Sequence, residues 1–381
     1  MTVRLCTLAG LTTPALVATI AAVLIVDAHE DIAWNALTFG RDYTTSARQI
    51  RAAEAGSETP TQNGMACLGR AEWLSGRVGV IIATLFVSPQ RRRLGTWDQL
   101  CYRDAAEAHR LAHAQLDHYL RMEEEHPAFR VIRNRADLDA VTGSWEAQPP
   151  TQRRIGLVLL MEGADPIRAP NEVQHWHERG VRLIGPAWAR TRYCGGTGDP
   201  GALTRAGEAL LEHMAAHGII LDVSHMSERS FEQALERYDG VIIASHANPR
   251  CAADLSTPER ALSDDQIRKL AARDGVIGVI PYNRFLKTGW RPAEGKQAVS
   301  VKRVAEIMDY ICQLTGSSRH VGIGSDFDGG FGADAIPTPM DSVADLHMIG
   351  AALGQLGYGS GQVKQLLSGN WLTVLQWGLP E

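Results

Sequence analysis

Short apolar runs alternate with longer amphipathic stretches along the chain. The runs are rich in Val, Ile and Leu, which is typical of parallel strands buried on both faces. We predict strands at Val23–His29, Val78–Val87, Ile155–Glu162, Val181–Ala187, Gly218–His225, Val241–His246, Val276–Tyr282 and His320–Asp326. The stretches between them favour helices at Trp97–Glu125, Asn171–Arg179, Leu203–Ala216, Glu228–Arg237, Ser263–Arg273 and Val301–Leu314. Three of these helices start at typical N-cap residues, Thr204, Ser227 and Ser263.

This alternation predicts the fold class. Eight strand–helix units over roughly 300 residues match the (β/α)8 TIM barrel, which takes about 250 residues before insertions. An open, doubly wound α/β sheet is the alternative. Residues 32–76 are predicted to be an insertion after the first strand, and no repeat, linker or charge block divides the chain. We therefore expect one domain over residues 23–381, preceded by a leader or extra segment over residues 1–22.

The N-terminal segment is mostly apolar up to Val26, and Arg4 is its one charged residue. Such a run is similar to a secretory signal, but Thr12, Thr13 and Pro14 interrupt it and no clean Ala-x-Ala site follows. A cleaved signal and a packed extra segment both stay open. We predict a cytoplasmic protein, with export as the alternative.

Composition narrows the possible functions. With 45% hydrophobic and 21% charged residues, a chain of 381 residues can bury a large core, which excludes disordered and low-complexity classes. A net charge of −5 gives no electrostatic reason to bind nucleic acid or an anionic membrane, so a small partner fits better. The six cysteines form no CxxC pair, and the end of the chain lacks the apolar tail of a membrane anchor. No integral membrane span is expected.

Side chains that can bind metal fall at the ends of the predicted strands. In a barrel these ends converge on one face. Taken singly, each residue has an ordinary explanation as a cap, a core histidine or a salt-bridge partner. Taken together, they predict a metal site. The set is His29, Asp31, Glu162, His225, His246 and Asp326.

The order of these residues in short motifs is recognisable. The motifs Asp27-Ala-His29-Glu-Asp31, Glu162-Gly163, Asp222-Val-Ser-His225, Ser245-His246-Ala-Asn248 and Gly324-Ser-Asp326-Phe-Asp328-Gly329 lie in this order. This pattern resembles the membrane (renal) dipeptidase family, peptidase family M19 of the amidohydrolase superfamily, from about Ile25 to Leu375.

The resemblance implies a (β/α)8 barrel with two zinc ions per chain. It implies that one ion is held by His29, Asp31 and a bridging Glu162, and the other by Glu162, His225 and His246. Arg260 matches the family arginine that receives the substrate carboxylate. Asp326 matches the acidic residue that handles protons and contacts the substrate amine. Relatives are commonly dimers, so a homodimer is expected.

The chain departs from the family pattern in two places. After the bridging glutamate it reads Glu162-Gly163-Ala164-Asp165 where the family typically has Glu-Gly-Gly-His. Trp188 aligns with a substrate-binding histidine of the animal enzymes, and an indole cannot replace a protonatable imidazole at the scissile carbonyl. We expect Trp188 to line the substrate pocket, with Arg192 or Tyr193 as candidates for the missing polar contact.

The chemistry implied is hydrolysis of a dipeptide amide by a metal-bridging hydroxide, with Glu162 and Asp326 as catalytic residues. Asp222 is a candidate for orienting a ligand by hydrogen bonds, and Asp328 for the same role or for a turn. Two other functions stay open. One is hydrolysis of another small amide or an N-acyl amino acid, and the other is a metal-binding barrel without catalysis. A serine nucleophile is not expected, because no Gly-x-Ser-x-Gly elbow surrounds Ser224 or Ser245.

Overall fold

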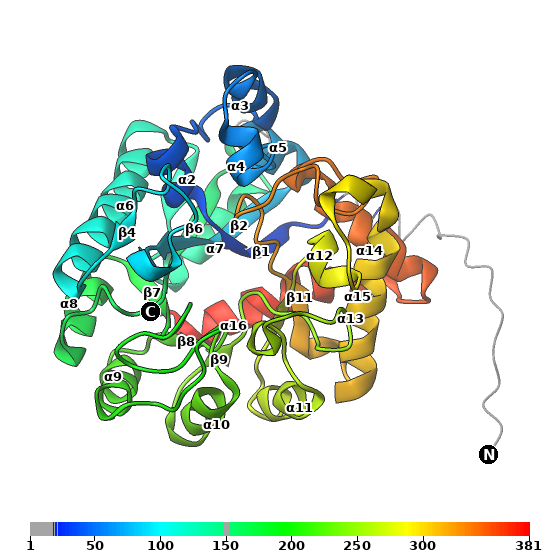
Figure 1. Cartoon of the computed structure of the whole chain (residues 1–381). Coiled ribbons are helices and arrows are strands. Elements are labelled where there is room, and N and C mark those ends of the chain that lie inside the picture. Colours follow the sequence, from blue (N-terminus) through cyan, green and yellow to red (C-terminus); the bar gives the residue numbers. More distant parts are fainter. Residues whose placement is uncertain (1–17, 19, 21, 148–151) are drawn as a thin grey trace, which may run out of the picture.

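The computed structural model describes residues 18, 20, 22–147 and 152–381. Parallel strands form a nearly closed barrel with helices around it, which confirms the predicted TIM-barrel class (Figure 1). The predicted leader over residues 1–22 lies almost entirely outside the described residues. The division of the chain into this leader and one domain stays a prediction. No helix among the described residues is long and apolar enough to cross a bilayer.

The eight predicted strands are all present. In their order around the barrel they are β10 (Ile277–Val279), β11 (Val321–Ile323), β1 (Ile25–Glu30), β2 (Val78–Phe86), β6 (Ile155–Glu162), β7 (Val181–Gly185), β8 (Ile220–Asp222) and β9 (Ile242–Ile243). A parallel bridge between Ala244 and Ile277 brings the two ends of this order together. Most strands end a few residues earlier than predicted, so the residues after them form the loops at the mouth of the barrel.

Three short strands were not predicted. β5 (Phe129–Val131) pairs with the first half of β6. β3 (Ser88–Pro89) and β4 (Cys101–Tyr102) pair only with each other. Because β4 and the loop around it occupy residues 97–104, the helix predicted at Trp97–Glu125 begins later, at Ala105. Its N-cap is Asp104, whose side chain accepts a hydrogen bond from the backbone of Glu107.

Helices surround the barrel. Those in the insertion after β1 are α2 (Ile32–Phe39), α3 (Ala47–Glu54), α4 (Thr59–Asn63) and α5 (Arg70–Gly76). The others are α6 (Ala105–Glu125), α7 (Arg135–Ser144), α8 (Val173–Glu178), α9 (Arg205–Ala216), α10 (Glu228–Arg237), α11 (Asp264–Ala272), α12 (Asn283–Leu286), α13 (Val301–Thr315), α14 (His347–Gln355), α15 (Ser360–Lys364) and α16 (Asn370–Gly378). Thr204 and Ser263 cap their helices as predicted, whereas the hydroxyl of Ser227 donates to the carbonyl of Gly201 instead.

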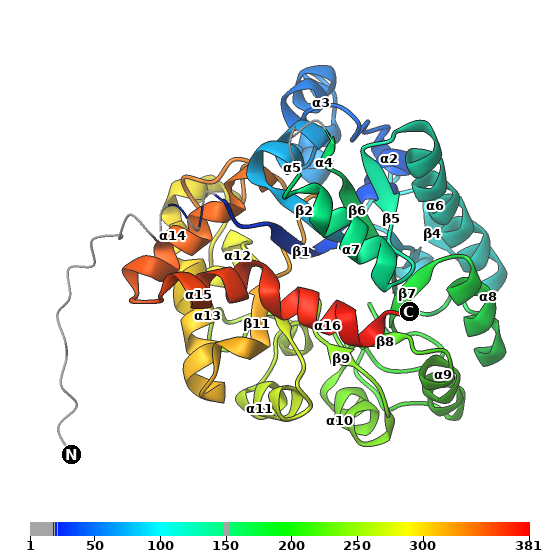
Figure 2. The same ribbon diagram turned by 180° about the vertical axis from the view of Figure 1, so that it is seen from behind.

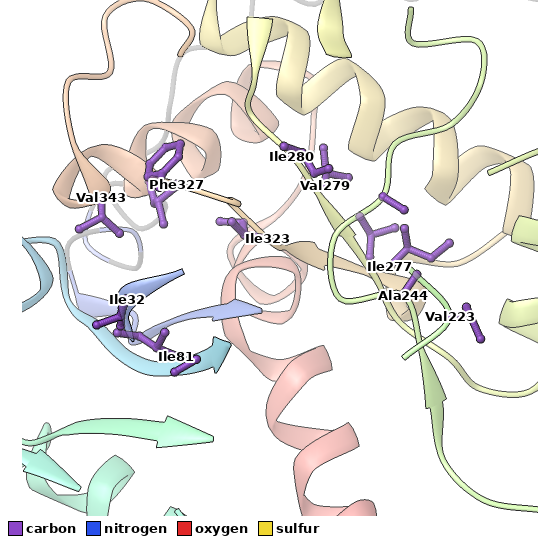
Figure 3. Packing of buried hydrophobic residues seen from close by; sticks show 14 of the residues in the cluster. Ile32, Ile81, Val223, Ala244, Ile277, Val279, Ile280, Ile323, Phe327 and Val343 are labelled. Carbon is purple, nitrogen blue, oxygen red and sulfur yellow. The ribbon is translucent and has the colours of Figure 1, made fainter. Parts of the chain in front are cut away.

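Alternate residues of the strands pack on different sides. Ile81 of β2 belongs to the large layer between strands and helices, of which Figure 3 shows a part. Val80 and Ile82 belong to a second cluster, which joins six barrel strands to α16. Figure 2 shows α16 crossing the back of the barrel, where the indole of Trp371 donates to the carbonyl oxygen of Ile323 at 3.0 Å. The core thus fills the barrel and leaves the opposite end for the loops.

The insertion is fastened to the end of β11 through Asp328. One carboxylate oxygen of Asp328 accepts a hydrogen bond from Tyr43 at 2.8 Å and lies 3.2 Å from a guanidinium nitrogen of Arg41. The other oxygen accepts the backbone N–H of Cys67 at 2.7 Å. Asp328 therefore anchors the insertion and does not serve only a turn, and Asn35 links its backbone oxygen to that of Asp31.

Candidate active site

The predicted metal-binding residues come together at the carboxyl end of the barrel. Glu162 is the last residue of β6, and Asp31 directly follows β1. His225, His246 and Asp326 each lie three residues beyond the end of their strand. All of these side chains, and that of His29, are buried. The parallel strands thus bring together residues that are nearly 300 positions apart in the sequence.

One group consists of His29, Asp31 and Glu162. The Nε2 atom of His29 lies 3.9 Å from Asp31 Oδ1 and 3.4 Å from Glu162 Oε2. This nitrogen is buried and has no hydrogen-bond partner among the described residues. A buried imidazole nitrogen without a partner, facing two carboxylates, is an arrangement that a cation would satisfy.

A second group shares Glu162 with the first. Glu162 Oε1 lies 3.1 Å from His225 Nε2 and 3.5 Å from His246 Nε2, and these two nitrogens are 3.0 Å apart. The two oxygens of Glu162 therefore face two different sets of ligand atoms. A third, overlapping group contains His29, His246 and Asp326. Within the described parts of the chain, only these groups bring three or more such ligand atoms within 4.8 Å of one another.

Burial dominates the electrostatics of the site. It raises the pKa of Glu162 to about 8 and that of Asp326 to about 8, although Arg260 opposes both shifts. Burial, helped by the charge of Glu162, raises the pKa of Asp31 to about 6. Burial also lowers the pKa of His225 and His246 well below the usual value, so both rings are neutral at pH 7. Neutral imidazoles and crowded carboxylates, for which Arg260 is only a partial counter-charge, suit the binding of a divalent cation.

Two of the site residues have left-handed backbones. His225 has a φ of 65° and Asp326 a φ of 58°. Such angles are uncommon outside glycine and are frequent at functional sites. Close by, a Cβ added at Gly329 would lie 2.2 Å from Asp326 Oδ1 and 2.9 Å from Asp31 Oδ2. Only glycine therefore leaves room for both carboxylates.

Hydroxyl groups contact three of the candidate ligands and orient their side chains. The Ser245 hydroxyl donates to Asp222 Oδ2 at 2.5 Å and lies 2.8 Å from His246 Nδ1. Thr197 Oγ1 lies 2.9 Å from His225 Nδ1, and the Thr84 hydroxyl donates to Asp31 Oδ1. In His225 and His246 the Nδ1 atom has a hydroxyl partner, so Nε2 can face the other ligand atoms.

The site opens into a cavity of about 870 Å³. Arg260, in the turn Pro258–Arg260, lines this cavity and is 7% exposed. Its Nη1 donates to the backbone carbonyl of His246 at 2.9 Å, and its Nη2 lies 3.5 Å from Asp326 Oδ2. The ring of Phe285 packs against the guanidinium at 5.1 Å. A fixed guanidinium beside the cluster can receive a carboxylate in bidentate geometry.

Comparison with known proteins places this geometry in a family. Residues 16–377 match the family model described as membrane dipeptidase, peptidase family M19. The chain belongs to this family. It is accordingly an enzyme, a metallopeptidase of the dipeptidase class, as the motifs predicted.

Similar proteins match the chain over different lengths. A Klebsiella pneumoniae protein, named as an uncharacterized protein in the pqqA 5′ region, is 32% identical over 233 residues, which are 58% of this chain and 82% of that protein. The probable dipeptidase PvdM from Pseudomonas aeruginosa superposes with a TM-score of 0.76 at 18% identity, over 95% of this chain and 97% of that one. A Rhodobacter sphaeroides metallopeptidase, liganded with a phosphinate mimic of the dipeptide L-Ala-D-Ala, has a TM-score of 0.70 at 23% identity, over 94% and 99% of the two chains. Both structures share the fold.

Trp188 lies in the pocket of this family member as expected. It lines the cavity, and its ring centre is 5.1 Å from that of Phe86 and 6.3 Å from that of His225. The expectation that Arg192 or Tyr193 supplies the missing polar contact was wrong. Neither residue lines the cavity. Both turn to the loop after β6, where Arg192 lies 3.3 Å from Asp165 and the Tyr193 hydroxyl donates to a backbone carbonyl.

Two residues that line the cavity were not predicted from the sequence. Trp34, on α2, and Asp98, in the loop before β4, both line the cavity. Trp34 Nε1 and Asp98 Oδ1 are buried and have no hydrogen-bond partner among the described residues. No motif marks them, since neither follows a predicted strand directly. Both residues therefore belong to the wall of a cavity that is rich in aromatic rings.

Proposed function

We propose that this protein is a zinc-dependent dipeptidase that hydrolyses the amide bond of short dipeptides and binds two Zn²⁺ per chain. The observation that carries the proposal is the position of Glu162, whose two oxygens face two separate sets of buried ligand atoms. In this assignment His29, Asp31 and Glu162 hold one ion, and Glu162, His225 and His246 hold the other.

The residues present fit zinc. Imidazole nitrogens and carboxylate oxygens are common zinc ligands. The Nε2 atom of His29, which has no hydrogen-bond partner among the described residues, supports coordination of a metal ion by this nitrogen. Zinc in such a site supplies a nucleophilic water at neutral pH and polarises the scissile carbonyl.

Arg260 and Asp326 supply substrate binding and proton transfer. Arg260 binds the carboxylate at the end of the substrate, because its buried guanidinium is held in place by the carbonyl of His246. The Asp326 carboxylate takes the proton of the attacking water and returns it to the leaving amine, acting as general base and then as general acid. Asp326 also contacts the substrate amine.

Two observations bear on the substrate. The structural neighbour from Rhodobacter sphaeroides is liganded with a dipeptide mimic, which supports a dipeptide here. The family resemblance, however, aligns Trp188 with a substrate-binding histidine of the animal enzymes. This substitution favours a second candidate in the same chemical class, hydrolysis of another small amide or of an N-acyl amino acid. A metal-binding barrel without catalysis is not retained, because the chain belongs to a family of dipeptidases.

A substrate panel tests the proposal. Purified protein loaded with zinc is assayed against L,L- and L,D-dipeptides and against N-acyl amino acids. Glu162→Gln is the inactive variant, and Glu232→Gln, at a half-buried carboxylate on α10 that pairs with Lys269, is the matched control. We expect turnover of dipeptides by the wild type and the control only. Cleavage of N-acyl amino acids alone would replace the dipeptidase by the second candidate. Zinc binding without turnover of any of these compounds would contradict both candidates.

Two further assignments accompany the proposal. A homodimer is proposed from the family resemblance, and sedimentation equilibrium that gives the mass of one chain would overturn it. A cytoplasmic location is proposed with export as the alternative. Sequencing of the mature N-terminus decides between them, because a signal peptide is removed on export.

A further inference from the structure

Three histidines gather on the outside of the barrel, away from the candidate active site. His109 and His113 lie four residues apart on α6, which places them on one face of the helix. His175 lies on α8, beside α6 in Figures 1 and 2. The Nε2 atoms of His113 and His175 are 3.2 Å apart. The ring centre of His109 is 4.4 Å from that of His113 and 6.2 Å from that of His175.

The neighbours of these rings orient them. His109 Nδ1 lies 3.0 Å from the carbonyl oxygen of Pro166, which fixes this nitrogen as the donor and leaves the lone pair on Nε2. The buried indole of Trp176 stacks on His113 with ring centres 4.4 Å apart. His113 therefore rests on a rigid base and points its Nε2 toward His175.

The charges around the rings are balanced. On α6, Asp117 forms an ion pair with Arg179 at 2.7 Å. At the start of α8, Glu172 forms an ion pair with Arg168 at 2.7 Å, and its carboxylate also lies 3.9 Å from His109 Nδ1. Arg168 and Arg179 are thus each paired with a carboxylate, which compensates the positive charge of both side chains.

We infer that His113 and His175 form a binding site for a divalent transition-metal ion, such as Cu²⁺, Ni²⁺ or Zn²⁺, separate from the active site. Two imidazole nitrogens bound to one ion at about 2.0–2.1 Å each lie about 3.0–3.4 Å apart, which is the separation of these two Nε2 atoms. Imidazole is a favoured ligand of all three metals, with Cu²⁺ bound most tightly. His109 does not reach this spacing in the structure and joins as a third ligand only after a shift of its ring. Water completes the coordination.

The proposed site lies next to a contact with the loop after β6. His109 holds that loop through Pro166, four residues beyond Glu162. An ion bound by His113 and His175 would link α6, which contacts this loop through His109, to α8, which follows the loop in the sequence. The expected direct result is metal binding. Its failure leaves the dipeptidase proposal untouched, because none of the three histidines belongs to the active-site groups.

Copper binding to the zinc-loaded protein tests the inference. Wild-type holoenzyme, freed of loosely bound zinc by gel filtration, is titrated with Cu²⁺, and the bound ion is followed by calorimetry and by the nitrogen hyperfine pattern in its EPR spectrum. We expect one Cu²⁺ per chain beyond the zinc content, with at least two coordinated nitrogens. His113→Gln and His175→Gln should each weaken this binding at least tenfold, and His109→Gln should weaken it less.

The control is His126→Gln, at the end of the same helix, which should bind Cu²⁺ like the wild type. Zinc content and dipeptide hydrolysis are measured in every variant, so that loss of the outer site is distinguished from loss of the active site. Binding of no extra ion by the wild type, or equal binding by the wild type and by both the His113 and His175 variants, would overturn the inference. Displacement of the active-site zinc by Cu²⁺ with no additional equivalent bound would overturn it too.

Discussion

Ser245 links the candidate metal centre to the carboxylate behind it. Its hydroxyl donates to Asp222 at 2.5 Å and accepts from His246 Nδ1 at 2.8 Å, and it lies 3.4 Å from His29 Nδ1. One small side chain thus touches imidazoles from both ligand groups. Substitution Ser245→Ala deletes this oxygen and adds no atom, so neither imidazole is pushed from its place by a new contact.

The expected cost follows from these contacts. Loss of a group that orients a ligand typically weakens metal binding about 10- to 100-fold, which is about 1.4–2.8 kcal/mol. We expect Ser245→Ala to fall in this range for zinc. The variant also leaves Asp222 with one fewer partner, so the metal-free protein should lose about 1–3 kcal/mol of unfolding free energy.

The assay is a zinc titration in competition with a chromophoric chelator, run beside urea unfolding of the metal-free proteins. Ser368→Ala is the matched control, because Ser368 is also buried but lies next to α16, away from the candidate site. The control should bind zinc like the wild type. Equal zinc affinity of Ser245→Ala and the wild type would refute the reasoning that this hydroxyl orients the ligands.

Three further predictions follow from the geometry and charge of the site. Gly329→Ala should lower kcat at least tenfold in steady-state kinetics with the fold intact by circular dichroism, because the new Cβ would displace the carboxylate of Asp326; unchanged kcat would contradict this. Trp188→His should raise kcat/KM for dipeptides severalfold, because an imidazole can donate to the scissile carbonyl, and a decrease would assign the pocket to a different amide. In the metal-free protein, Glu162 and Asp326 have folded-state pKa values of about 8, above unfolded values of about 4. Deprotonation therefore destabilises the folded state, and urea unfolding should show a loss of about 1–3 kcal/mol between pH 6.5 and 8. A flat or rising curve over this range would be contrary evidence.

The strands and the residues at their ends could be predicted from local sequence. Runs such as Ile155–Glu162 are apolar throughout because strands of a closed barrel are covered on both sides, and this leaves a clear pattern. A strand that ends at Glu162, or three residues before His225 or His246, then has its ligand at the mouth of the barrel by topology alone. For this reason the candidate site required no knowledge of distant contacts.

Contacts between segments that are far apart in the chain leave no such pattern in the sequence. The prediction for Arg192 and Tyr193 rested on their nearness to Trp188 in sequence, but the chain turns both toward the loop after β6. The late start of α6 depends on the pairing of β3 with β4, two strands of two residues each, which are too short to show alternation. The role of Asp328 became visible only when the insertion was folded back onto it.

The central claim is a centre of two zinc ions joined by Glu162, and metal analysis of the purified protein tests it most directly. Mass spectrometry of zinc after equilibration and desalting should give two ions per chain for the wild type and for Glu232→Gln. Glu162→Gln should fall below one, because its amide cannot serve both ligand groups as a carboxylate does. Fewer than about one zinc in the wild type, or an unchanged zinc content in Glu162→Gln, would contradict the account.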